Sequence, residues 1–388
     1  MGALQDERNK LFLDLLGGKE WKKPARVPFQ MNVDPQAALE YFGYNVRRDS
    51  YSAQKCYEAA DKMCELIDTD TLPCNPGATL GTVFRYIGQK FMVPGEDGFF
   101  QHPNFSPMEF NEYEKYIKNP YEFIVGTLHP RVFEVFDDEY PELAHIRIRI
   151  ARQVGNAEYA GMVAKLKEKY QREDVFVQAN LLWAPFDFVA DYVRSFTTIL
   201  TDMKRAPQLV IDACEATADY LIHQIKTSPA PVPGKISNIS FPLHMAPYMS
   251  TKDVEKFYWP TFVKVIKAAH DHGYMARIHF EADWTPHMHL IADLPTGGPT
   301  IAQFENAKRD LILKYVPKSA VWLGTYPFTL IKTGKKQECI DEVKKVIDTL
   351  AVNGNYIFSP NTSAIRAGDV NLENMQAVIQ CVKEYGKY

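Results

Sequence analysis

The sequence predicts an α/β fold, a (β/α)8 barrel (TIM barrel) with a loop-rich insertion in its N-terminal half. From residue 235 onward, short segments rich in β-branched residues alternate with helical patterns, which is typical of a parallel sheet covered by helices. Further strand-like segments in the first half raise the count to the eight strand-helix units of a barrel. The alternative fold is an open doubly wound sheet, but no glycine fingerprint of dinucleotide binding follows the first predicted strand.

The N-terminal half contributes the less regular elements. Strands are predicted at 26–32, 65–73 and 175–186, from short runs of apolar and β-branched residues. The region 75–150 between them is aromatic, dotted with proline and rich in loops. We predict that it is an insertion that packs over the mouth of a single barrel domain spanning residues 1–388.

The segment 250–273 is predicted to be one of the helices that alternate with the strands. Ser250 is a predicted N-cap and Gly273 a predicted C-terminal stop, while Pro260 predicts a kink or a break into two helices. The remaining strands are predicted at 235–245, 274–280, 299–305, 320–326 and 355–361, and the remaining helices at 284–294, at 306–316, in a long helix ending at Gly354, and at 371–386.

Composition argues against several classes of function. The chain has 388 residues, a formal net charge of -4 and 46% hydrophobic residues. This balance gives no basic footprint for nucleic acid, and no apolar run approaches the roughly 18 residues of a membrane span. The charged first residues lack the apolar core of a signal peptide, which predicts a cytoplasmic protein. The six cysteines are scattered and are expected to be buried thiols.

Polar side chains recur at the carboxyl ends of the predicted strands, where a barrel carries its active site. Trp183 lies near one of these ends, where a flat apolar substrate could stack. The candidate set consists of Gln30, Asn32, Asn180, His244, His279, Glu281, Asp283, Glu305, Tyr326 and Asn361.

The stretch "MARIHFEADW" places His279, Glu281 and Asp283 two positions apart. The side-chain period of a strand is two, so all three are predicted to point the same way. His279 and Glu281 could hold one metal ion, and zinc is compatible if a third ligand, which the sequence does not identify, completes the site. The alternatives are an ion pair in which Glu281 orients His279, and a solvated rim of the barrel. His244 has its own alternative, a core histidine bonded to backbone.

The chain resembles the uroporphyrinogen decarboxylase superfamily, and within it the branch of corrinoid-dependent methyltransferases that includes aryl-ether O-demethylase components. The resemblance rests on the order and spacing of several stretches. These are "KKPARVPFQ", "TDMKRAPQLVIDACE", "MSTKDVEKFYWPTFVKVIKAAHDHG", "ARIHFEADW" and "NGNYIFSPNTSAIRAGDVNLENMQAV".

Two departures from the family pattern narrow the expected substrate. The arginines that bind propionate groups in the decarboxylases are missing from "FQMNVDPQAA", which argues against a porphyrinogen substrate. The His-x-Cys motif and distant cysteine that ligate zinc in methyltransferases acting on coenzyme M are replaced by His279-Phe280-Glu281 and by Asn361-Thr362. An oxygen-rich site of this kind suits an oxygen-bearing methyl donor.

The resemblance therefore implies transfer of a methyl group from a small donor, such as an aryl methyl ether, to the Co(I) corrinoid of a separate protein. The implied catalytic residues are His279, Glu281 and Asp283, which bind zinc or protonate the leaving oxygen. The implied substrate-binding residues are Gln30, Asn32, Asn180, Trp183, His244, Tyr326 and Asn361. Region 75–150 is the expected dock for the corrinoid protein. Two alternatives remain, a corrinoid-free decarboxylase of a small aromatic or pyrrolic acid and a non-catalytic binding protein.

Overall fold

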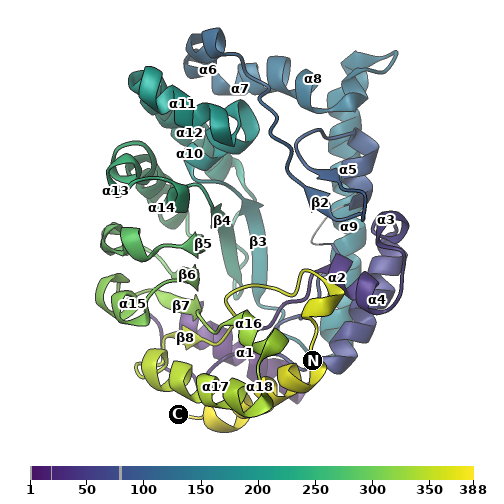
Figure 1. Cartoon of the computed structure of the whole chain (residues 1–388), viewed down its shortest axis with the longest axis vertical. Helices are drawn as coiled ribbons and strands as arrows, with labels where there is room; N and C mark the ends of the chain where they lie inside the picture. The colour runs from purple at the N-terminus through teal and green to yellow at the C-terminus, as the bar shows by residue number, and fades with distance from the viewer. Residues whose placement is uncertain (1, 19, 78–80) are drawn as a thin grey trace.

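A computed structural model describes residues 2–18, 20–77 and 81–388 (Figure 1). Its centre is a six-stranded parallel sheet in the sequential order β3-β4-β5-β6-β7-β8. The strands span β3 Phe176–Leu181, β4 Ile236–Leu243, β5 Met275–Asp283, β6 Thr300–Asn306, β7 Val321–Gly324 and β8 Tyr356–Ile357. A two-stranded antiparallel hairpin, β1 Val93–Pro94 and β2 Phe100–Gln101, lies in the first half.

Two irregular segments, 28–33 and 68–73, close the sheet into a barrel. Segment 28–33 pairs in parallel with β8, because Gln30 N donates to Phe358 O at 2.9 Å. On its other side, the N–H of Asp70 donates to Phe29 O at 3.0 Å. Asp70 O in turn accepts from Glu173 N at 3.0 Å, just before β3. Six strands and two segments thus give the eight positions of the predicted barrel.

Helices cover the outside of the barrel (Figure 1). The α-helices are α1 Ala3–Leu16, α2 Pro35–Tyr41, α3 Val46–Asp49, α4 Ala53–Leu66, α5 Gly81–Ile87, α6 Tyr113–Lys118, α7 Pro120–Phe123, α8 His129–Val132, α9 Ala144–Lys169, α10 Pro185–Phe188, α11 Phe196–Arg205, α12 Pro207–Thr227, α13 Thr251–Asp253, α14 Trp259–Asp271, α15 Arg309–Tyr315, α16 Phe328–Thr333, α17 Lys336–Leu350 and α18 Leu372–Tyr385. The 3-10 turns are η1 Phe110–Glu112, η3 Glu134–Phe136, η4 Pro141–Leu143, η6 Ala246–Tyr248, η8 Thr285–Asp293 and η9 Ala367–Asp369, and the π-helical turns are η2 Ile124–Leu128, η5 Val189–Arg194 and η7 Val254–Tyr258.

The predicted helix 250–273 forms, with the N-cap and the C-terminal glycine at the expected positions. The hydroxyl of Ser250 accepts from Asp253 N at 3.2 Å, and Gly273 adopts a φ of 80° that glycine tolerates without strain. The π-helical turn η7 precedes Trp259, so Pro260 falls in the first turn of α14, where its missing N–H costs no hydrogen bond. The helix does not break in two at Pro260: it continues from α13 through the π-helical turn η7 into α14, and the local irregularity is that turn.

Region 75–150 forms the hairpin, short helices and the start of α9. α6 and α7 pack on α12, and α5 packs on α9. In Figure 1, α6, α7 and α8 lie together at one end of the molecule, between α11 and α9. The role of this region as a dock over the mouth stays a prediction.

α1 covers the amino end of the barrel. Phe12, Leu15 and Leu16 are buried together with residues from the beginnings of the strands. These residues are Val175, Ile236, Met275, Ile301 and Val321. The opposite end, where the strands finish, is therefore the one left for a functional site.

The six cysteines are buried and free, as expected. None of the helices in the described ranges has the length and apolar composition needed to cross a bilayer.

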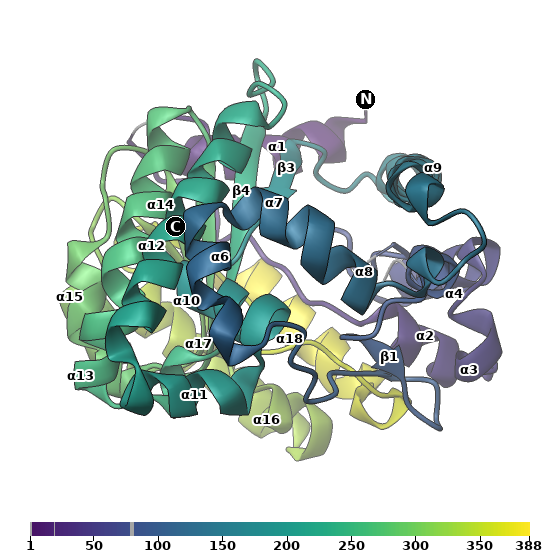
Figure 2. The same ribbon diagram turned by 90° about the horizontal axis from the view of Figure 1, so that it is seen from above.

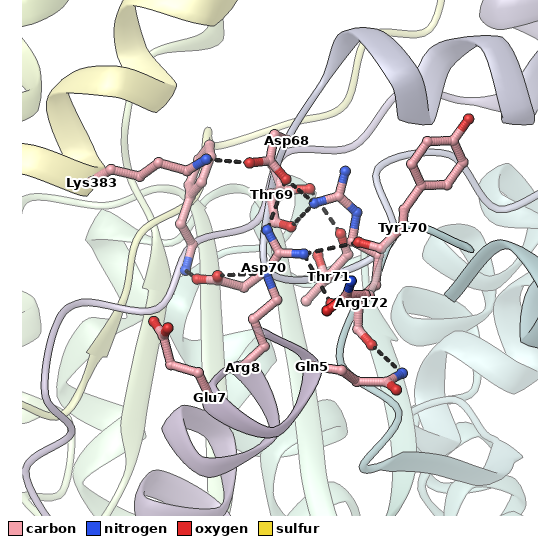
Figure 3. A network of polar contacts seen from close by, with 12 residues as sticks. Gln5, Glu7, Arg8, Asp68, Thr69, Asp70, Thr71, Tyr170, Arg172 and Lys383 are labelled. Atoms are coloured by element: carbon pink, nitrogen blue, oxygen red, sulfur yellow. Dashed lines mark hydrogen bonds and ion pairs between the residues drawn. The ribbon is translucent and has the colours of Figure 1, made fainter. Parts of the chain in front are cut away.

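An ion network fixes α1 to the irregular part of the barrel (Figure 3). Asp68 accepts from Arg8 Nη2 at 2.7 Å and also binds Arg172 and Lys383. Arg8 and Arg172 have almost no exposed surface. Burial alone would raise the pKa of Asp68, but the three cations outweigh it and hold that pKa well below its usual range.

Asp70 is the buried centre of the same network. Its two carboxylate oxygens accept from Arg26 Nη1 and Nη2, each at 2.8 Å, and one also accepts from Phe29 N at 2.9 Å. Arg8 Nε lies 3.4 Å from Asp70 Oδ1. Desolvation of these charges is tolerated only because each is paired.

Asp70→Asn is predicted to lower the free energy of unfolding by about 3 kcal/mol, because it leaves buried guanidinium groups without a counter-charge. Urea unfolding followed by circular dichroism measures the effect. The matched control is Asp271→Asn, which removes a carboxylate from an exposed pair with Lys267 and should leave the unfolding midpoint unchanged. Equal midpoints for the two variants would contradict the role given to Asp70.

Candidate active site

Four ionisable residues meet at the barrel end opposite α1. His244 follows β4, His279 and Glu281 lie near the end of β5, and Glu305 lies near the end of β6. Parallel strands finish on the same side, so neighbouring strands bring these groups together. Their side chains keep between 25% and 33% of their surface exposed. The cluster is thus half-buried and accessible to a molecule that approaches the mouth.

His279 is held between two carboxylates. Its Nδ1 lies 3.8 Å from Glu281 Oε1, and its Nε2 lies 3.5 Å from Glu305 Oε1. Nε2 is buried and reaches hydrogen-bond geometry with no group in the described residues. Burial raises the pKa of Glu281, and Glu305 and Asp191 add to the rise while His279 and His244 oppose it. Glu281 therefore retains its proton at a higher pH than an exposed glutamate does.

Glu305 also shapes the end of β5. Its Oε2 accepts from Ala282 N at 2.7 Å, and Ala282 has a φ of 57°. Burial alone would raise the pKa of Glu305, but the contact with His279 and the bond from Ala282 hold it below the usual value. A left-handed alanine costs of order 1 kcal/mol, so the surrounding structure must maintain it.

The expectation that Asp283 shares a face with His279 and Glu281 is wrong. The β5–β6 register shifts between Phe280 and Asp283, as in a β-bulge, with Ala282 left-handed at that point. Asp283 is exposed, and its carboxylate accepts from Thr285 N at 2.9 Å, at the start of η8. The bulge breaks the period-two alternation on which the expectation rested.

His244 binds a second acid that the sequence analysis did not identify. Its Nε2 is hydrogen-bonded to Asp191, which lies in η5. Burial opposes a charge on the ring, yet Asp187 and Asp191 outweigh it and raise the pKa of His244 to about 9. The imidazole is therefore protonated at neutral pH, and Nδ1 has no hydrogen-bond partner among the described residues.

Asp187 is fully buried beneath His244. It accepts from Tyr258 Oη at 2.6 Å and from the backbone N–H groups of His244 and Met245 at 3.3 and 3.2 Å. Burial raises the pKa of Asp187 to about 7. Asp187 and Asp191 are four residues apart on one helix face, and that spacing, directly after a predicted strand, was the sequence signal that could have identified them.

The geometry does not assemble the expected zinc site. A catalytic zinc needs three protein ligands that converge on one point. Glu281 and Glu305 approach different nitrogens of His279, on opposite sides of the ring. Within 2–18, 20–77 and 81–388, no three His, Cys, Asp or Glu side chains form a group able to hold a metal ion. His279 and Glu281 thus remain a pair without a third ligand.

Three predicted substrate-binding residues have structural partners elsewhere. Tyr326 is fully buried and donates to Cys339 O at 3.1 Å, toward α17. Gly324 and Thr325, both with positive φ, precede Tyr326 and alter the direction of the chain. Asn361 accepts from Phe328 N at 2.8 Å, and Asn180 donates to Ser228 Oγ at 3.2 Å. Asn361 Nδ2 also donates to Asn306 Oδ1 at 3.4 Å, next to Glu305 at the end of β6, whereas the contacts of Tyr326 and Asn180 lead away from the histidine cluster.

Gln30, Asn32 and Trp183 line other parts of the barrel. Gln30 is buried and lies 3.5 Å from Ser359 Oγ, while Asn32 is half-buried in segment 28–33, across the barrel from β5. Trp183 follows β3 and packs edge-on against Phe188, with ring centroids 5.9 Å apart. Trp183 follows β3 and His244 follows β4, and these two strands are neighbours in the sheet, so Trp183 is the nearest of the three to His244 in strand order.

This arrangement supports proton chemistry on a bound substrate. A protonated His244 can donate a hydrogen bond from Nδ1, and Glu281 is a carboxyl group with a raised pKa. Asp187 and Asp191 lie beside His244 and stabilise positive charge on its ring.

A family model described as uroporphyrinogen decarboxylase (URO-D) matches residues 150–385, more than half of the chain. Among solved structures, a methyltransferase from Methanosarcina mazei has a similar fold, with a TM-score of 0.60 and 15% identity over 98% of this chain and 98% of that chain. No curated protein sequence matches this chain. By the sequence match to the family model, the chain belongs to the uroporphyrinogen decarboxylase family.

Proposed function

We propose that this protein is a methyltransferase that removes a methyl group from the oxygen of a small ether, most simply an aryl methyl ether. The observation that carries the proposal is the placement of His244 at the barrel mouth, where Nε2 is hydrogen-bonded to Asp191 and Nδ1 has no hydrogen-bond partner among the described residues. A methyl ether reacts slowly because its leaving group is a basic alkoxide or phenoxide. A proton placed on that oxygen removes the obstacle.

The match between donor and leaving group favours an aryl ether. The pKa of His244 is about 9, close to the value of about 10 for the phenol of tyrosine, a model for the departing phenol. The phenoxide is the stronger base of the two, so transfer of the proton from His244 to the departing oxygen is favourable. His244 Nδ1 gives its proton to the ether oxygen as the methyl–oxygen bond breaks, and the phenol leaves neutral.

Asp191 and Asp187 position and charge His244. Asp191 binds Nε2 of His244, so Nδ1 points away from Asp191. The carboxylate of Asp187 accepts from the backbone N–H of His244 and fixes its backbone. Glu281 lies close enough to His244 for their charges to interact. Glu281 is therefore placed to return a proton to the site after each turnover.

The methyl acceptor in this proposal is a corrinoid carried by a separate protein, which supplies a strong nucleophile in its reduced form. The exposed quarter to third of each site residue is compatible with a cofactor that comes from outside. This chain's own residues bind the ether, orient its oxygen and protonate it.

A decarboxylase is the second candidate, and the family match favours it. The same protonated His244 could quench a carbanion after loss of CO2. The two reactions differ in their need for cobalt and in their products.

The first test incubates the protein with free cob(I)alamin and a set of methyl ethers, methylamines and methyl thioethers. We expect loss of cob(I)alamin absorption with aryl methyl ethers and release of one phenol per methyl group transferred. Methyl transfer from amines or thioethers but not from ethers would contradict the proposal. Release of CO2 from an aromatic acid without cobalt would establish the decarboxylase instead.

His244→Gln is predicted to lower the rate of methyl transfer by about 10²- to 10⁴-fold, the usual contribution of a positioned general acid. The matched control is Asp283→Asn, because Asp283 is also at the end of β5 but points away from the cluster. Equal activity of the two variants would exclude His244 as the proton donor.

The pH dependence provides a separate prediction. The reaction needs His244 protonated, so the rate should fall as the pH rises through about 9. Asp191→Asn removes a charge and weakens the bond to Nε2, and should move this alkaline limb down by roughly one pH unit. An alkaline limb that stays in place in Asp191→Asn would show that another group titrates.

Metal analysis tests proton donation against metal ligation. We expect less than stoichiometric zinc in the purified protein and the same content in Glu281→Gln, since three ligands do not converge. One zinc per chain in the parent and none in Glu281→Gln would make His279 and Glu281 metal ligands, and would contradict protonation as the means of activation.

A further inference from the structure

The long helix α9 carries an uncovered apolar stripe. Ile146, Ile150 and Val154 are 55%, 53% and 63% exposed, and Leu143, just before the helix, is 41% exposed. The stripe continues toward the C-terminal end with three small exposed residues, Ala157, Gly161 and Ala164. A Cβ atom added at Gly161 would meet nothing within 4 Å, so this part of the helix faces open space.

The stripe lies on the face of α9 that points away from the molecule. Its members recur every three or four residues, which places them on one side of a helix. The opposite side carries the buried residues Ile148, Tyr159 and Leu166 and packs on α4 and α5. Figure 2 shows α9 at the edge of the molecule, beside α4 and apart from β3. Three large β-branched side chains in one exposed row are unusual for a monomer.

The order of side chains along the stripe is self-complementary. Large residues occupy its first half and small residues its second half, at mirror-related spacings about a point beside Val154. In an antiparallel pair of such helices, Leu143 faces the partner's Ala164, Ile146 faces the partner's Gly161, and Ile150 faces the partner's Ala157. Leu143, Ile146 and Ile150 then each meet a small side chain, which lets two helices approach closely, and Val154 lies beside the partner's Val154 at the axis.

From this pattern we propose that α9 pairs with α9 of a second copy of the chain, antiparallel about a two-fold axis beside Val154. Such a contact is isologous, so each favourable pair occurs twice.

The charges along one flank agree with this register. Arg147 and Glu158 lie on the same side of the stripe, and antiparallel pairing brings equal flanks together. Arg147 therefore approaches the partner's Glu158. Arg147 binds Asp138 in its own chain, and Glu158 has no ion pair within the described residues. The contact adds a partner for Glu158 on each copy.

The size of the contact sets the expected affinity. The stripe spans 22 residues, or about 33 Å of helix, and covers on the order of 400 Å² per copy. That is roughly half of the about 800 Å² per partner in a typical stable interface. An interface of this size belongs to the weak, reversible class of association.

Sedimentation velocity of the full chain across the micromolar range tests the proposal. The parent should shift from monomer to dimer with concentration. Ile150→Glu places two charges near the axis and should weaken association at least tenfold. The matched control is Val352→Glu, at a residue 65% exposed in the turn after α17, which should associate as the parent does. A parent that stays monomeric, or a dimer unaffected by Ile150→Glu, overturns the proposal.

Cysteine cross-linking tests the register and the orientation. Val154→Cys lies beside the axis and should form a covalent dimer on mild oxidation. Ile146→Cys alone should not, because its two copies would be about 22 Å apart along the helix. The double variant Ile146→Cys/Gly161→Cys should form a covalent dimer, because position 146 of one copy faces position 161 of the other. Cross-linking of Ile146→Cys alone as fast as Val154→Cys would rule out the antiparallel register.

Discussion

The structure depends on the buried carboxylate and peptide of Asp70, which join parts of the molecule that no regular strand joins. Its carboxylate binds Arg26 and the N–H of Phe29. Its backbone N–H donates to Phe29 O and its carbonyl accepts from Glu173 N, so it links segment 28–33 to the residues just before β3. Here the two irregular segments close the barrel whose six regular strands are parallel, and α1 covers the amino ends of those strands. The carboxyl ends of β4, β5 and β6 consequently converge at the free end, and with them His244, His279 and Glu305.

At that end, the balance of charge determines the chemistry. Asp187 and Asp191 lie beside His244 and raise the pKa of its ring, although burial opposes the charge. The result is a histidine whose proton is held tightly enough to persist at neutral pH, yet whose Nδ1 has no protein acceptor among the described residues. A polar, proton-donating site of this kind differs from one built on thiolate ligands, and it accords with the lack of cysteine at the positions that the family resemblance highlights.

The alternation of strand-like and helical segments was enough to predict the barrel, the strands from β4 onward, and His244, His279 and Glu281 at strand ends. Segments 26–32 and 65–73 occupy barrel positions as predicted but form few ladder bonds, since prolines such as Pro28 and Pro73 have no N–H to donate. The errors at Asp283 and Tyr326 share one cause. A left-handed residue, Ala282 or Thr325, precedes each, and neither residue type signals positive φ in a sequence. Asp187 and Asp191 were missed because aromatic neighbours made their segment resemble ordinary core.

The account requires that His244 carry a proton at neutral pH because of the acids around it. Nuclear magnetic resonance of protein labelled with nitrogen-15 in its histidine rings measures this directly, with His244→Gln used to assign the signals. We predict that the ring of His244 remains protonated through neutral pH and titrates near 9. A ring that loses its proton at or below about 6.5, the ordinary value for histidine, would contradict the account.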